Sequence, residues 1–114
     1  MDAESLVERR CLPCEGGVKP LSTVEAEPLL NQLASHWSIE SAKDHQQLVK
    51  RFGFPDFKSA VDFVNRITEV AEAEGHHPDL LVQWGSVRVQ LWTHAAGGLT
   101  ENDFILAAKL DRLG

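Results

Sequence analysis

The segment 57–74 constrains the fold of this chain more than any other stretch of the sequence. Its apolar residues recur every three or four positions and so share one side of a helix; they are Phe57, Ala60, Val61, Val64, Ile67, Val70 and Ala71. Polar residues such as Lys58 and Asp62 occupy the positions between them. The spacing predicts an amphipathic helix over 57–74 with one wide apolar face. Asp56 can cap its start, and Gly75 suits the position just past its end.

A helix and a hairpin are predicted before this segment. Ser22 and Glu25 have the spacing of a capping box, and leucines at helical spacing follow them. Together they predict a short helix over 24–35. Alternating apolar and polar residues then predict strands over 37–39 and 48–54, which a short polar turn joins into a hairpin.

A second hairpin and a last helix are predicted after it. Strands over 78–84 and 87–94 flank Gly85-Ser86, which suits the centre of a type II′ turn. A capping-box-like start then predicts a helix over 101–113. The order helix-strand-strand-helix-strand-strand-helix predicts an α+β fold, with a four-stranded antiparallel sheet and three helices packed on one face.

Length and charge narrow the function classes. A chain of 114 residues holds one domain, so we interpret 1–20 as an N-terminal arm and 21–114 as a single domain. Eleven basic and 17 acidic residues give a net charge of −6, which disfavours direct binding of nucleic acid. No apolar run approaches the ~20 residues of a membrane helix, and the N-terminus lacks a signal-peptide core. We therefore expect no membrane partner and a cytoplasmic location.

The two cysteines, Cys11 and Cys14, form a single C-x-x-C in the run RCLPCEGG. Such a motif can be half of a zinc site or a redox pair. The zinc interpretation lacks a second pair of ligands at suitable spacing. The redox interpretation expects a helix start, whereas prolines and glycines surround this motif. We therefore expect reduced thiols in an irregular surface arm.

Three of the five histidines are predicted to meet at one end of the sheet. In the expected hairpin, His77 and His94 flank the turn almost symmetrically, and Glu72 lies one helical turn before His76. Gln90, Trp92 and His94 share the polar face of their strand, which can line a site or an interface. The residues alone leave three interpretations open: a structural cluster, a zinc site of three histidines, or metal-free acid–base catalysis.

The run EAEGHHPDLLVQWGSVRVQLWTHAAGGLTENDF closely resembles the pterin-4a-carbinolamine dehydratases, also called 4a-hydroxytetrahydrobiopterin dehydratases. The family pattern corresponds here to Glu72 or Glu74, His76, His77, Pro78, Trp84, Thr93, His94 and Asp103. The resemblance runs from about Leu21 to the C-terminus. The arm motif CLPCEGG also resembles bacterial members.

The resemblance implies a fold and an activity. The fold is the α+β arrangement predicted above. The activity is loss of water from a 4a-hydroxytetrahydropterin to give the quinonoid dihydropterin, without a metal or cofactor. This step completes pterin recycling after an aromatic amino-acid hydroxylase, which is thus an implied pathway partner. Self-association into dimers or tetramers is also implied, and mammalian members act in addition as a dimerisation cofactor for a homeodomain transcription factor.

The resemblance also assigns residues. It implies a catalytic set of His76, His77 and His94, in which His76 and His94 are the acid–base pair, in either order, and His77 orients the pterin. Substrate-binding positions are implied at Glu72, Asp103, Trp37, Thr93 and Pro78. Asp103 can instead cap a helix, and Trp37 can simply pack in the core. The alternative functions are a non-catalytic binding module, which a degenerate motif would favour, and a zinc hydrolase.

Overall fold

Four antiparallel strands form the sheet on which the fold is built, in the order β1-β2-β4-β3. In this computed structural model, which describes residues 3–12, 18–34 and 36–113, the strands are β1 (Ser38–Ser41), β2 (Gln46–Gly53), β3 (Asp79–Gln83) and β4 (Ser86–Leu91). The two hairpins meet in the centre of the sheet, where β2 pairs with β4. Every pairing is antiparallel, as the sequence predicts.

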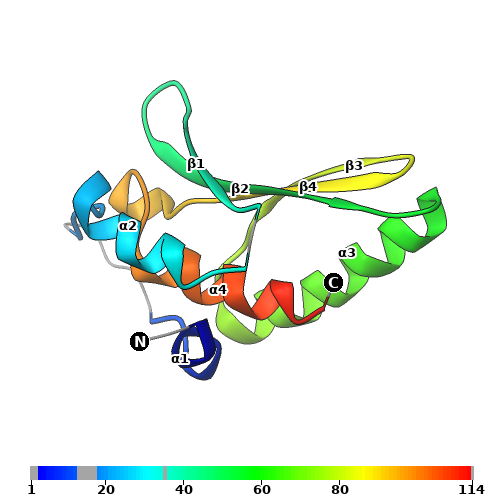
Figure 1. The fold of residues 1–114 in the computed structure, drawn as a ribbon, viewed down its shortest axis with the longest axis horizontal. Helices are drawn as coiled ribbons and strands as arrows, with labels where there is room; N and C mark the ends of the chain where they lie inside the picture. Colours follow the sequence, from blue (N-terminus) through cyan, green and yellow to red (C-terminus); the bar gives the residue numbers. More distant parts are fainter. Residues whose placement is uncertain (1–2, 13–17, 35, 114) are drawn as a thin grey trace.

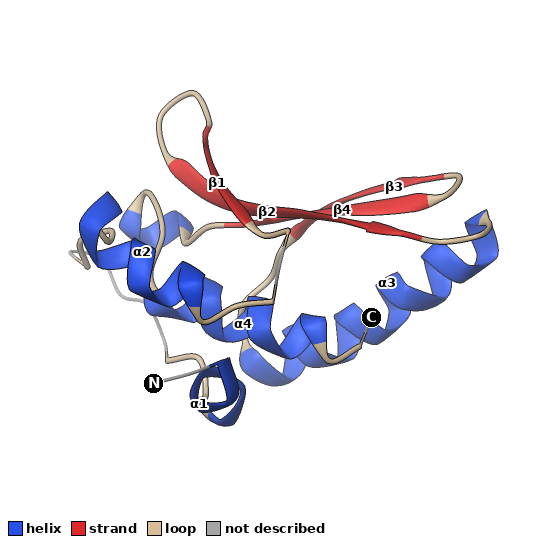
Figure 2. Cartoon of the chain, in the orientation of Figure 1, coloured by secondary structure: helices blue, strands red, loops and turns tan. Residues whose placement is uncertain are grey.

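Three helices cover one face of this sheet (Figures 1 and 2). They are α2 (Thr23–Asn31), α3 (Phe57–Glu74) and α4 (Glu101–Asp111). The predicted α+β class and element order are confirmed for the described residues from 21 to 113. The bounds of α3 match the prediction, and Gly75 ends it in the left-handed conformation, with φ 65°. A short 3-10 helix, η1 (His94–Ala96), connects the sheet to α4.

The core lies between the sheet and the helices. Val87, Val89 and Leu91 point inward from β4 and have no exposed surface, whereas Arg88 and Gln90 between them are only partly buried. This alternation is what a strand with one buried face requires. The helix α4 is buried along most of its length because α1 (Ala3–Glu8) packs against it from outside.

The N-terminal arm is more ordered than its composition predicts. Residues 3–8 form the helix α1, and Leu6 is fully buried in the core. One apolar side chain at the right place therefore anchors a segment that we expected to be irregular. Cys14 lies outside the described residues. Among the residues that the structure describes, no helix is long and apolar enough to cross a membrane.

The second hairpin turns one residue earlier than predicted. Gln83 pairs with Ser86, so Trp84 and Gly85 form the tip, and neither has a positive φ, which a type II′ turn would need. The pairing of β3 with β4 is thereby shifted by two residues. A shift of two leaves every side chain on the same face of the sheet, so the apolar pattern could not distinguish the two registers.

Candidate functional site

A cavity of about 300 Å³ lies at the end of the sheet where α3 stops and β4 gives way to η1. His76, His77 and His94 all line it, together with Leu12, Trp92 and Thr93. The structure thus brings the three histidines together, although the observed register does not place His77 opposite His94. The cap at Gly75 reverses the chain after α3, and the backbone N–H of His76 donates to the carbonyl of Ala71.

His76 is held by a buried carboxylate. Its Nε2 lies 2.6 Å from Oδ1 of Asp103, which has no exposed surface. The other oxygen of Asp103 accepts from the hydroxyl of Thr93 (3.0 Å) and from the backbone N–H of Thr100 (2.9 Å). Asp103 therefore caps α4 and orients His76 at once. Because Nε2 donates to the carboxylate, a neutral His76 keeps Nδ1 as a proton acceptor.

A second carboxylate contacts His77. Oε2 of Glu72 lies 2.5 Å from Nε2 of His77, and both side chains are exposed. This geometry separates the two acids that the family pattern leaves open. Glu72 belongs to the histidine cluster.

Glu74 serves the N-terminal arm instead. Its carboxylate accepts from the backbone N–H of Cys11 (2.8 Å) and from Lys109 (2.7 Å). Burial by itself would raise the pKa of Glu74, but these hydrogen bonds and the charge of Lys109 hold it below the ordinary value.

His94 is held by ring stacking. Its imidazole stacks on the indole of Trp92 with ring centroids 3.8 Å apart, and His45 stacks on the opposite side of that indole at 3.5 Å. Among the described residues, no hydrogen bond to the His94 ring is found, and the side chain is exposed. Stacking on Trp92 therefore fixes the plane of the ring at the cavity.

The remaining predicted site residues lie at different depths. Thr93 is buried, and its hydroxyl also contacts that of Thr100. Pro78 borders a separate small hollow behind His77. Trp37 is not brought to the cavity: it is buried in the core, and its indole N–H donates to Asp111 (2.9 Å). Trp84 is exposed at the hairpin tip.

Sequence reasoning missed Leu12 and Asn102 as cavity residues. Both line the cavity, but one belongs to the arm and the other to the first turn of α4, ninety positions apart. No spacing rule relates such positions, so only the docking of the arm reveals them.

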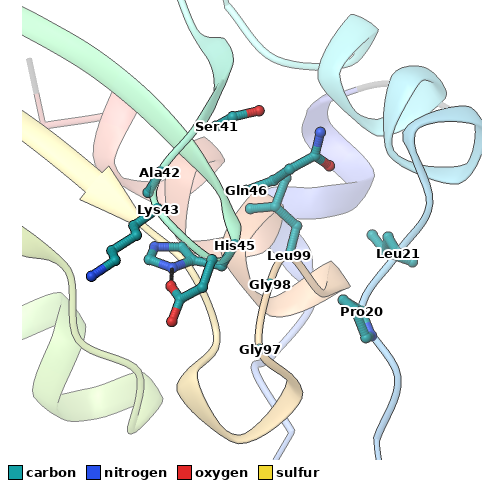
Figure 3. A pocket seen from close by; sticks show the side chains of 11 residues that line it. Pro20, Leu21, Ser41, Ala42, Lys43, His45, Gln46, Gly97, Gly98 and Leu99 are labelled. Carbon is teal, nitrogen blue, oxygen red and sulfur yellow. Dashed lines mark hydrogen bonds and ion pairs between the residues drawn. The ribbon is translucent and has the colours of Figure 1, made fainter.

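A second cavity, of about 360 Å³, is lined in part by His45, which belongs to the aromatic stack (Figure 3). Pro20, Lys43, His45, Gln46 and Leu99 are among the residues that line it. Nε2 of His45 is buried, and among the described residues it has no hydrogen-bond partner. In the part of the chain that the structure describes, no three His, Cys, Asp or Glu side chains are grouped so as to hold a metal ion.

Comparison with known proteins gives a consistent result. The family model described as pterin 4 alpha carbinolamine dehydratase matches residues 19–113. A protein of Rickettsia bellii (strain OSU 85-389), provisionally named pterin-4-alpha-carbinolamine dehydratase, is 48% identical over 109 residues, covering 96% of this chain and 94% of its own length.

Two solved structures are similar. One, of a transcriptional coactivator/pterin dehydratase from Brucella melitensis, has a TM-score of 0.74 and 28% identity, covering 83% of this chain and 98% of its own. The other is a pterin dehydratase-like protein identified as a RuBisCO assembly factor in the alpha-carboxysome. It has a TM-score of 0.57 and 25% identity, covering 68% of this chain and 88% of its own.

Proposed function

The chain belongs to the pterin 4 alpha carbinolamine dehydratase family, and we propose that it dehydrates 4a-hydroxytetrahydrobiopterin to the quinonoid dihydropterin and water. The observation that carries this proposal is the cavity lined by His76, His77 and His94. Two of these imidazoles are paired with carboxylates, and the third is stacked in place. Residues that give and take protons near neutrality therefore surround a space of small-molecule size.

The reaction needs one proton donor and one proton acceptor. The C4a–O bond breaks as a proton reaches the departing hydroxyl, which leaves as water. N5 loses its proton, and the electrons of that N–H bond form the C4a=N5 double bond. An imidazolium and a neutral imidazole supply both transfers, and each contributes typically about 10²–10⁴-fold to the rate.

The geometry favours His76 as the base. Its Nδ1 is the available acceptor, and the buried carboxylate of Asp103 stabilises the imidazolium that forms when His76 takes the N5 proton. His94, on the same cavity, is then the acid that protonates the hydroxyl. His77, supported by Glu72, binds the polar edge of the pterin.

The alternative is a non-catalytic binding module. Two similar structures, of a transcriptional coactivator/pterin dehydratase and of a pterin dehydratase-like RuBisCO assembly factor, support it as a second candidate. The retained histidines and Asp103 favour the enzyme. Self-association into dimers or tetramers and a pathway link to an aromatic amino-acid hydroxylase remain proposals that derive from the family. Light scattering of the purified chain tests the first of them.

The test is a dehydratase assay. An aromatic amino-acid hydroxylase generates the 4a-hydroxytetrahydropterin in situ, and its ultraviolet decay is followed with wild type and with His76→Ala. We expect wild type to accelerate the decay and the variant to lose that acceleration. A folded wild type without effect would favour the binding module.

A further inference from the structure

We propose that Leu12, in the described part of the N-terminal arm (residues 3–12), is a substrate-contacting residue of the histidine cavity, so that this segment determines how tightly the pterin is held. This inference rests on the proposed function and adds a residue to it. The arm contributes no strand to the sheet and is not one of the three helices that cover it.

The arm is fixed to the body of the protein at several points. Leu6 is fully buried, and α1 lies against α4 (Figure 1). Arg9 forms an ion pair with Glu101 at 2.7 Å. The backbone N–H of Cys11 donates to Glu74 at 2.8 Å. Held by these contacts, the chain runs along α4 and reaches the edge of the cavity.

Leu12 is held there by a reciprocal pair of hydrogen bonds. Its N–H donates to Oδ1 of Asn102 (3.0 Å), and its carbonyl accepts from Nδ2 of the same residue (2.6 Å). Asn102 is only 7% exposed and directly precedes Asp103, which orients His76. Leu12 and His76 are therefore positioned by two adjacent residues in the first turn of α4.

The Leu12 side chain has a large exposed apolar surface. It is 72% exposed and yet lines the same cavity as His76 and His94. An exposed leucine beside polar imidazoles has apolar surface that a flat heterocycle can cover. Covering it removes apolar surface from water on both molecules, which favours binding. We therefore assign Leu12 to the apolar face or substituent of the pterin.

The arm lies outside the part of the chain that the family model matches. The family model begins at residue 19, after the arm. The alignment with the Rickettsia bellii protein covers 109 residues of this chain, so it includes most of the arm. The arm is thus an addition shared with such relatives. Because the chemistry belongs to the core, Leu12 should affect substrate affinity without changing the rate of the bound substrate.

The experiment compares Leu12→Ser and Leu12→Met with Leu81→Ser, a matched control at another exposed leucine on the open face of the sheet. KM and kcat are measured in the dehydratase assay, and the Kd of a dihydropterin is measured by titration. We expect Leu12→Ser to raise KM and Kd about fivefold or more, with kcat within twofold of wild type. Leu81→Ser should match wild type, whereas Leu12→Met, which keeps an apolar side chain, should raise KM and Kd less than Leu12→Ser does. Asn102→Ala, which releases the end of the arm, should act like Leu12→Ser.

Two results would overturn the inference alone: KM and Kd of Leu12→Ser equal to those of Leu81→Ser, or a lower kcat at unchanged KM. Each requires an active wild type, so each leaves the proposed function standing. A folded wild type that neither binds a dihydropterin nor accelerates dehydration would overturn the proposed function, and the inference with it.

Discussion

Nε2 of His76 lies 2.6 Å from Oδ1 of Asp103, a carboxylate with no exposed surface. Thr93 and the backbone of Thr100 hold the other oxygen of this carboxylate. The imidazole therefore presents its other nitrogen to the cavity in one orientation. Asp103 therefore caps α4 and also belongs to the proton-transfer machinery that we propose.

The first prediction concerns that carboxylate. Asp103→Asn keeps the size of the side chain but no longer stabilises a protonated His76, so we expect kcat to fall by about 10²-fold or more. Asp56→Asn is the matched control, since Asp56 caps α3 far from the cavity through its bond to Ser59. Steady-state kinetics and circular dichroism check both. Near-normal kcat in folded Asp103→Asn would restrict Asp103 to its capping role.

The second prediction separates chemistry from stacking at His94. Both His94→Ala and His94→Phe should lose activity by about 10²-fold or more, because neither can transfer a proton. Both should fold, since the side chain is exposed. Phe retains a ring that can stack on Trp92. If His94→Phe kept its activity, ring packing and not proton transfer would be the role of this residue.

The third prediction concerns Trp92 as a positioning residue. Loss of one aromatic contact removes about 0.5–1.5 kcal/mol, so we expect Trp92→Leu to lower kcat about threefold to tenfold by loosening His94. Trp92→Phe should restore most of the loss. A Trp92→Leu variant with wild-type kcat would show that the stack of His45, Trp92 and His94 does not matter for the reaction.

The fold was predictable wherever a sequence pattern was compatible with only one structure. The apolar face of 57–74 gave α3 with its bounds, and the alternation in 87–91 gave the buried side of β4. The hairpin register was not predictable, because a shift of two residues keeps the same faces. The docking of the arm was not predictable either, because Leu6 is buried among residues that are distant from it in sequence.

The site was predictable in part for similar reasons. His76 and His77 follow the end of a predicted helix, and His94 follows a predicted strand, so their meeting could be inferred. Two glutamates fit the loose motif. Glu72 matches it better by its spacing from His76, but the histidine that it contacts could not be assigned from the sequence. The structure shows Glu72 beside His77 and Glu74 beneath the arm. Trp37 was a candidate by resemblance, and its bond to Asp111 places it in the core.

The fourth prediction concerns the C-x-x-C motif. Burial, together with the negative charge of Glu74, raises the pKa of the Cys11 thiol to about 12. The thiolate is the reactive form, so Cys11 should resist alkylation at pH 8. Iodoacetamide labelling of a Cys14→Ser variant checks this by mass spectrometry, with the denatured protein as the positive control. Rapid labelling of the native variant would contradict the partly buried position of Cys11.

The fifth prediction concerns Glu74 and pH. Its pKa in the folded protein lies below the ordinary 4.5, so its carboxylate stabilises the fold above that pH and ceases to do so as the pH falls through the folded pKa. Glu74→Gln should lower the free energy of unfolding by about 1–3 kcal/mol at pH 7. Denaturant melts at several pH values should show this difference shrinking below pH 4.5. A difference that is independent of pH would mean that the charge of Glu74 has no part in anchoring the arm.

The function that we propose requires that the cavity lined by His76, His77 and His94 holds a pterin. Nuclear magnetic resonance of the histidine rings tests this while a dihydropterin is titrated into the wild-type protein. We predict that the signals of these three residues shift with one common Kd, while the exposed and distant His36 stays unchanged. Absence of any shift, or shifts confined to His45 beside the second cavity, would contradict the account.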